Sequence, residues 1–237
     1  METVTLYTRQ HEHSLHELET TGRMTNKRLY VELHMRDIAP FFLEKYDHFV
    51  ALAERIIPRP ADSPYPIWAS ISKQNCLKPI DKEIVYCLEV PVDRIIYFDG
   101  GKWDYVLNDL YIPADDTDAR RYARELKMLH VDNQFEFLHG KYKGYFPEIE
   151  KRIVDSWERI FTIDRWDHFV VQANLWEIRR EWIRHIVRPG EDFFKITVDM
   201  EDSDHEAVYR RLIDTKKRRN HPPRYCRDAK PAPRDFP

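Results

Sequence analysis

The order of apolar and polar positions predicts strands and helices along the whole chain. Alternation over residues 4–9 predicts a first strand, and the apolar spacing that ends at Gly22 predicts a short helix capped by that glycine. An apolar stripe at helical spacing after Pro40 predicts about four turns of helix that stop at Pro58. The proline-rich residues 58–66 predict an extended loop.

The rest of the chain changes repeatedly between the two patterns. Runs of β-branched and aromatic residues predict three strands, over residues 67–71, 84–90 and 94–98. Helical spacing then covers residues 103–110, 115–139 and 147–161. We expect strands over residues 169–178 and 193–198, a strand or turn over 182–186, and a last helix over 202–215. Strands and helices that do not alternate regularly indicate an α+β protein rather than a chain of βαβ units.

The predicted fold is one compact α+β domain over residues 1–215, with a central, mostly antiparallel sheet flanked by helices. The 237 residues are 42% hydrophobic and 33% charged, which suits a globular protein with a substantial core. No window approaches the eighteen or so apolar residues of a membrane span, and residues 1–3 do not begin a secretory signal. Three cysteines without a CxxC pair favour a reducing, cytoplasmic location.

Charge is distributed unevenly between the body of the chain and its end. Residues 216–237 carry a net charge of +6 and residues 1–215 carry −9. The final segment combines proline and charge without an apolar face, so we expect a disordered tail. Its cationic run, Lys216 to Arg219, could contact nucleic acid or an acidic protein through salt-sensitive phosphate or carboxylate contacts, or simply keep the chain in solution.

Neither the histidines nor the cysteines provide a convincing site on their own. The histidines near the start of the first predicted helix lack the HExxH spacing, so we expect no metal; they are His11, His13 and His16. Among the cysteines, Cys87 lies in an apolar strand and Cys226 in the tail. Cys76 lies in a polar context, but no base is indicated for a nucleophilic role.

Blocks of sequence spread over most of the chain resemble a bacterial family of domains of unknown function, number 3841. The blocks are Leu6–Gln10, Tyr65–Ala69, Arg94–Asn108, Ser156–Phe161 and Val171–Ile178, within about residues 4–190. Two segments depart from the family pattern, at residues 70–72 and 100–102. If these segments line a pocket, its selectivity would differ here.

More distantly, the layout is similar to the ADP-ribosyltransferase fold. That resemblance, a fold-level analogy, implies NAD as a co-substrate and no metal. It places Arg9 on the first strand as a pyrophosphate ligand, with Thr8 beside it, and Glu177 on a late strand. Glu177 would hold the ribose and stabilise an oxocarbenium-like transition state, and Ser70 would steady that glutamate.

The same resemblance assigns roles to three further side chains. Tyr65 or Trp68 would stack on a flat ring of the cofactor, and Gln172 would orient the acceptor. Two alternatives stay open. One is a non-catalytic binding or regulatory module, with phage defence as one setting, that acts through the basic tail. The other is a hydrolase or nuclease built on Asp99 and Asp104, which lack a convincing set of metal ligands.

Overall fold

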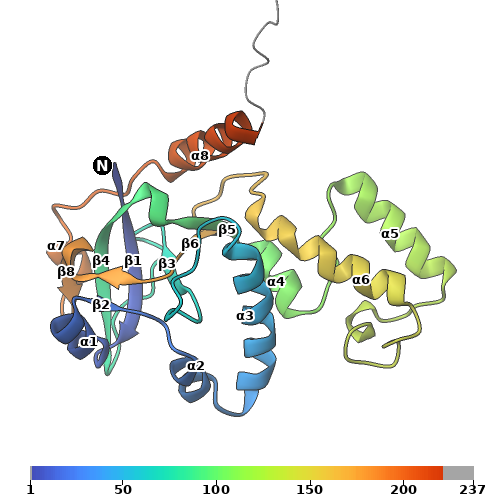
Figure 1. The fold of residues 1–237 in the computed structure, drawn as a ribbon, viewed down its shortest axis with the longest axis horizontal. Coiled ribbons are helices and arrows are strands. Elements are labelled where there is room, and N and C mark those ends of the chain that lie inside the picture. The colour runs from blue at the N-terminus through green and yellow to red at the C-terminus, as the bar shows by residue number, and fades with distance from the viewer. Residues whose placement is uncertain (1, 221–237) are drawn as a thin grey trace, which may run out of the picture. The chain divides into compact units, whose positions relative to one another are not determined.

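The computed structural model describes residues 2–220, which divide into one unit that ends at Ser203 and a second that begins at Asp204. The first unit contains both sheets and all helices but the last (Figure 1). The second contains helix α8, His205–Asn220. The loop over residues 58–66 lies inside the first unit, so it does not separate domains.

A six-stranded antiparallel sheet forms the centre of the first unit, as the alternating segments predict. Its strand order is β5-β6-β3-β1-β4-β8. The strands are β1 (Thr3–His11), β3 (Ile67–Ser70), β4 (Glu83–Pro91), β5 (Ile96–Asp99), β6 (Val171–Leu175) and β8 (Ile183–Val187). A separate two-stranded ribbon pairs β2 (Arg23–Met24) with β7 (Ile178–Arg179).

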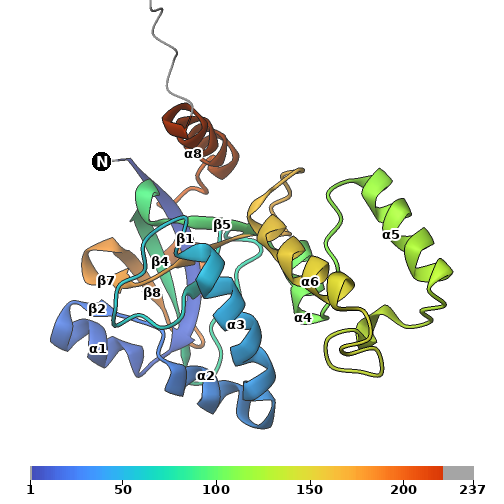
Figure 2. The same cartoon turned by 45° about the vertical axis from the view of Figure 1, so that its right-hand side comes forward.

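Helices and short 3-10 turns connect the strands and cover the sheet. The helices of the first unit are α1 (Ser14–Thr21), α2 (Arg28–Met35), α3 (Ala39–Ala53), α4 (Gly100–Leu107), α5 (Asp116–Met128), α6 (Pro147–Ser156) and α7 (Phe193–Ile196). Gly22 closes α1 in the left-handed conformation that the sequence predicts. Figures 1 and 2 show α3 running along the sheet and α5 and α6 beside each other beyond it. No helix among residues 2–220 is long and apolar enough to cross a bilayer.

Three segments differ from the predicted elements. The helix expected over residues 115–139 ends at Met128, because His130 adopts a positive φ of 55° that breaks the helical ladder. Residues 193–198 form a helical turn instead of a strand, since Asp192 accepts a hydrogen bond from the Lys195 amide and caps it. Helix α8 continues through residues 216–220, which were expected to be disordered, because lysine and arginine are good helix formers. Residues 221–237 of the predicted tail lie outside the described part.

An aromatic cluster joins α3 to one face of the sheet. The Phe49 ring lies 5.1 Å from Trp68 on β3, 5.6 Å from Phe98 on β5 and 5.4 Å from Trp103 on α4. Phe49 and Phe98 are almost fully buried, and such rings supply large apolar area as well as edge-to-face attraction. The apolar stripe after Pro40 therefore packs on β3 and β5.

Gly100 allows α4 to begin directly after β5. Its amide donates to the Val170 carbonyl at 3.0 Å, and a Cβ added at this position would lie 2.6 Å from that oxygen. Any side chain would therefore force the two backbones apart. Asp99 caps the helix by accepting from the Lys102 amide. The departure from the family pattern at residues 100–102 thus lies at this close backbone contact, where residue 100 has to be glycine.

The carboxyl group of Asp118 is a pH-sensitive anchor for α5. It accepts hydrogen bonds from the Tyr111 hydroxyl, the Ala114 amide and Arg121, and these hold the pKa of Asp118 well below its usual value, Tyr111 contributing most. A pKa lowered by folding stabilises the native state above the unfolded pKa of about 4 and stops doing so as pH falls.

We therefore expect Asp118→Asn to cost about 1.5–3 kcal/mol at pH 7, the worth of a hydrogen bond to a charged group. The difference in the free energy of unfolding between wild type and Asp118→Asn should narrow between about pH 4 and pH 2. Urea unfolding at pH 7 and pH 3 checks this. An equal gap at both pH values would show that the charge of Asp118 does not stabilise the fold.

Candidate functional site

Glu177 is the most enclosed carboxylate of the predicted site residues. It is the second residue after the end of β6 and directly precedes β7, and its side chain is 9% exposed. One carboxylate oxygen lies 2.6 Å from Arg23 Nη2 and the other 2.6 Å from Arg179 Nε. Each oxygen keeps lone-pair capacity for a further donor, because a carboxylate offers about four acceptor sites.

The small ribbon explains why two arginines meet at this carboxylate. Arg23 on β2 is directly opposite Arg179 on β7, a placement that brings two like charges together. Glu177 lies between them, and Asp62 accepts from Arg23 at 2.7 Å on the other side. The negative charges offset the repulsion, so the four side chains form one ion-pair network.

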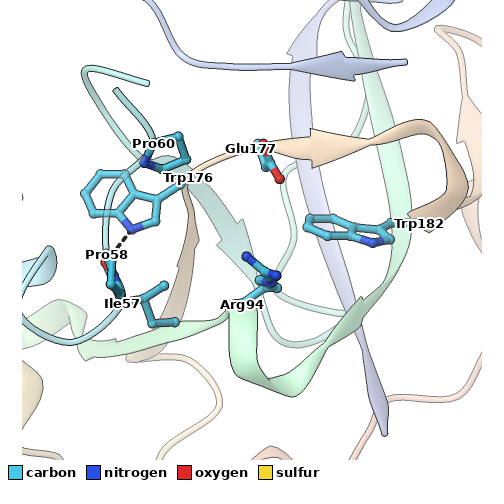
Figure 3. Close-up of a pocket in the computed structure, with 7 residues that line it drawn as sticks. All are labelled: Ile57, Pro58, Pro60, Arg94, Trp176, Glu177 and Trp182. Atoms are coloured by element: carbon cyan, nitrogen blue, oxygen red, sulfur yellow. Dashed lines mark hydrogen bonds between the residues drawn. The ribbon is translucent and has the colours of Figure 1, made fainter. Parts of the chain in front are cut away.

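Within this network, Glu177 lines a hollow in the surface, called here the Glu177 hollow (Figure 3). Its other lining residues are Ile57, Pro58, Pro60, Arg94, Trp176 and Trp182. Trp176 is fixed by donating from Nε1 to the Ile57 carbonyl at 2.9 Å, and Trp182 packs under the Arg179 guanidinium at 5.8 Å. The two indoles limit how much water can reach the carboxylate, which strengthens ionic interactions there.

The hollow is small enough to limit what can enter it. Its cavity volume is about 20 Å³, which is room for roughly one water molecule. A hydroxyl group fits this space and an aromatic ring does not. A larger ligand would therefore lie across the mouth and insert only a small polar group beside Glu177.

Arg94 is the available cation at this mouth. It ends a 3-10 turn between β4 and β5, its side chain is 52% exposed, and its sole ion pair within residues 2–220 is with Asp93 at 3.9 Å. Figure 3 shows Arg94, Glu177 and Trp182 turned toward the same space. A guanidinium so weakly engaged can bind an incoming anion through two parallel hydrogen bonds.

Ser70 and Gln172 lie together, at the other end of the strand pair from Glu177. They are cross-strand neighbours where β3 ends and β6 begins, whereas Glu177 follows the end of β6. This separation arises because β3 and β6 run antiparallel. The Ser70 hydroxyl donates to the Ser72 carbonyl at 3.1 Å. The structure does not bring Ser70 next to Glu177, and the catalytic roles predicted for Ser70 and Gln172 stay predictions.

The residues expected to bind a cofactor each have a partner in the fold. Arg9 lies 2.7 Å from Glu83 and also donates to the Lys78 carbonyl. The Thr8 hydroxyl donates to the Trp68 carbonyl at 2.7 Å, and the Trp68 ring belongs to the aromatic cluster around α3. These contacts connect β1 to its neighbours.

Tyr65 is nearly buried and bonds to α3. Its hydroxyl donates to Asp47 at 2.9 Å, and burial, assisted by that carboxylate, raises the pKa of Tyr65 to about 12. The Tyr46 ring lies 5.8 Å from it. Tyr65 is therefore a neutral donor at neutral pH, and its ring is enclosed by neighbouring aromatic groups.

The residues of the hydrolase or nuclease alternative and of the histidine cluster make structural contacts. Asp104 is exposed on α4, and its backbone carbonyl accepts from the Asn108 side chain. The rings of His11 and His13 contact each other with centroids 4.5 Å apart. Within the described residues, no three histidine, cysteine or acidic side chains gather where they could hold a metal ion.

Neither described cysteine has the features of a nucleophile. Cys87 is fully buried on β4, and desolvation raises its pKa to about 12. Cys76 is nearly buried, and desolvation raises its pKa despite a contact with Lys78 Nζ at 3.2 Å. The thiolate is the reactive form, so both groups should be inert in the folded protein.

With Cys226→Ser removing the remaining thiol, we expect iodoacetamide to modify the native protein at least about a hundredfold more slowly than the urea-unfolded protein. Mass spectrometry of timed samples measures both rates. Stoichiometric labelling of Cys76 in the native state at neutral pH would contradict the account and restore it as a candidate nucleophile.

The sequence pattern nominates Glu177 but not the side chains around it. Arg179 could have been identified, because residues two apart in a strand point to the same side. Arg23 and Arg94 come from segments far from Glu177 in the sequence, and only strand pairing and chain reversal bring them close. Trp182 lies in the segment predicted as a strand or turn, and nothing local marks it as a neighbour of Glu177.

Comparison with known proteins adds a family but no activity. A family model described as "Domain of unknown function (DUF3841)" matches residues 5–184. No curated protein and no solved structure matches the chain.

Proposed function

Because the chain belongs to the DUF3841 family, whose description states no activity, we propose a function from the geometry: an NAD-using transferase that resembles ADP-ribosyltransferases, with Glu177 at its centre. The observation that carries the proposal is a nearly buried carboxylate, fixed by two arginines, on the wall of a hollow that fits one hydroxyl group.

Glu177 supplies the chemistry that a ribose requires. Its oxygens keep acceptor sites beside those used by Arg23 and Arg179, so a ribose hydroxyl that enters the hollow can donate to it. The carboxylate then lies close to the sugar carbon from which nicotinamide leaves. Negative charge fixed beside a developing oxocarbenium ion lowers the barrier, because the low-dielectric walls strengthen that attraction.

The proposed reaction breaks one bond and forms one. The bond between the ribose C1′ and the nicotinamide nitrogen breaks, and its electron pair leaves with neutral nicotinamide. A nucleophilic oxygen or nitrogen of the acceptor, or water, bonds to C1′ and loses its proton to solvent. No oxidant or reductant is required.

Arg94 has a binding role in this scheme, alongside the role predicted for Arg9. It is half-exposed at the mouth of the Glu177 hollow, where a pyrophosphate attached to the bound ribose would pass. Arg9 lies on β1 and is already paired with Glu83. We therefore assign the principal phosphate contact to Arg94.

Isothermal titration calorimetry of the full chain with NAD tests whether the protein binds NAD and whether Arg94 contributes to that affinity. We expect wild type to bind NAD and Arg94→Ala to bind about tenfold more weakly, the loss of one charge-assisted contact. Arg124→Ala is the matched control, because Arg124 is an exposed arginine on α5. Equal affinities for wild type and Arg94→Ala, or no binding by wild type at millimolar NAD, would contradict the assignment.

A binding module that acts through the basic tail is the competing function. Deleting residues 216–237, which removes the cationic run Lys216 to Arg219, separates the two. A transferase keeps its NAD binding after the deletion, whereas a tail-mediated module loses its affinity for polyanions.

A further inference from the structure

A second hollow is lined by residues that neighbour, in the chain, those of the first. It is called here the Arg55 hollow, and it is formed by the end of α3 and the 3-10 turn Trp157–Phe161. Its apolar lining residues are Leu52, Ile56 and Phe161, and its polar ones are Arg55, Glu158, Arg159 and Thr162. The neighbouring residues Ile56 and Ile57 line the Arg55 hollow and the Glu177 hollow respectively.

The size of this hollow suits a ligand of one nucleoside. Its cavity volume is about 260 Å³, just below the range of about 300–1,000 Å³ typical of sites for drug-sized molecules. The Glu177 hollow is more than tenfold smaller, at about 20 Å³. A dinucleotide that inserts a hydroxyl at the small hollow would need separate space of the larger kind for its other base.

The charged groups of the Arg55 hollow are matched to a heterocycle with both donor and acceptor edges. Arg55 is exposed and has no ion pair within residues 2–220, and Glu158 likewise has none there. Arg55 can only donate hydrogen bonds and Glu158, ionised, can only accept them. An adenine ring offers nitrogen acceptors and an exocyclic amino donor, and so can use both.

The remaining lining residues are already positioned. Phe161 packs 5.2 Å from Phe49 and supplies apolar surface to the lining of the hollow. The Arg159 guanidinium lies 5.4 Å over Tyr111 and donates to the Ile112 carbonyl. Arg159 therefore contributes its apolar stem, which leaves Arg55 as the cation for the ligand.

We propose that the Arg55 hollow binds the adenylate half of the dinucleotide, with the chain at residues Ile56 and Ile57 lying between the two halves. This assignment rests on the proposed function, because it takes the ribose bound at Glu177 to belong to the same ligand. It identifies Arg55 and Glu158 as the residues that select a nucleobase.

Two half-ligands test this assignment apart from the proposed function. AMP and nicotinamide mononucleotide are titrated separately into the full chain, into Arg55→Ala, into Glu158→Ala and into the control Arg124→Ala. We expect both substitutions at the hollow to weaken AMP binding about fivefold or more and to leave the mononucleotide unchanged, since each removes one contact to the base. Both substituted residues are exposed, so the fold should be unaffected.

The outcomes distinguish the two proposals. The adenylate site is overturned if AMP affinity is unchanged in both Arg55→Ala and Glu158→Ala, or if nicotinamide mononucleotide displaces AMP. The role of Glu177 stands in either case. AMP binding that depends on Arg55 and Glu158, together with no mononucleotide binding and no nicotinamide release, supports the adenylate site and overturns the transferase proposal.

Discussion

Replacing Glu177 with glutamine is expected to lower the rate of nicotinamide release from NAD by about 10²–10³-fold, the usual cost of removing one group that stabilises transition-state charge. Glutamine keeps the size of the side chain and one acceptor oxygen, so NAD affinity should change far less than the rate. Loss of rate without equal loss of affinity is typical of a group that acts in the transition state.

The fold should tolerate this change. Arg23 keeps its ion pair with Asp62, and Arg179 is 44% exposed, so water can solvate the guanidinium that loses its partner. Glu125→Gln is the matched control, because Glu125 on α5 is also ion-paired with an arginine, Arg152 on α6, at 2.7 Å. Equal release by wild type and Glu177→Gln would exclude a catalytic role for Glu177.

The largest effect on stability is expected at Lys45. Its side chain is fully buried on α3, its Nζ is ion-paired with Asp109, and it lies 5.2 Å above the Trp157 ring. Asp109 is also nearly buried and adopts a positive φ of 58°. Removing one partner of a buried pair leaves the other charge without compensation, which costs about 3–5 kcal/mol.

We therefore expect Lys45→Met to lose about 3–5 kcal/mol, a large share of the roughly 5–15 kcal/mol that a domain typically has. Adding Asp109→Asn should restore part of that loss, because no charge is then buried and asparagine tolerates the positive φ. Urea unfolding measures all three proteins. Lys151→Met is the control, since solvent screens the exposed pair of Lys151 with Asp155 and the pair should contribute little to stability. Equal losses for Lys45→Met and Lys151→Met would contradict the account.

Local patterns predicted most of the fold because they reflect local physics. Alternation over β1 and the apolar stripe of α3 both follow from which side chains face the core, and both are confirmed. The predictions fail where the conformation or capping of a single residue decides the secondary structure. His130 ends α5 early through a positive φ, and Asp192 converts an apolar run into a capped helical turn. Neither event changes the periodicity of the neighbouring residues.

The site was harder to predict than the fold because its parts come from distant segments. Glu177 follows β6, whereas Arg23 and Arg94 reach it through the β2–β7 ribbon and the turn after β4. The ADP-ribosyltransferase resemblance places Ser70 beside Glu177. Antiparallel pairing of β3 and β6 instead puts Ser70 opposite Gln172, at the end of β6 away from Glu177. Lys45 gives no sequence signal at all, because a lysine within an apolar helix normally reaches solvent.

Nicotinamide release by the full chain is the measurement that tests the central claim most directly. Purified protein is incubated with NAD, alone and with cell lysate, DNA or RNA as acceptor, and free nicotinamide is quantified by chromatography. The account predicts release by wild type that is lost in Glu177→Gln and retained in Glu125→Gln. No release with any acceptor, together with no NAD binding by calorimetry, would contradict it.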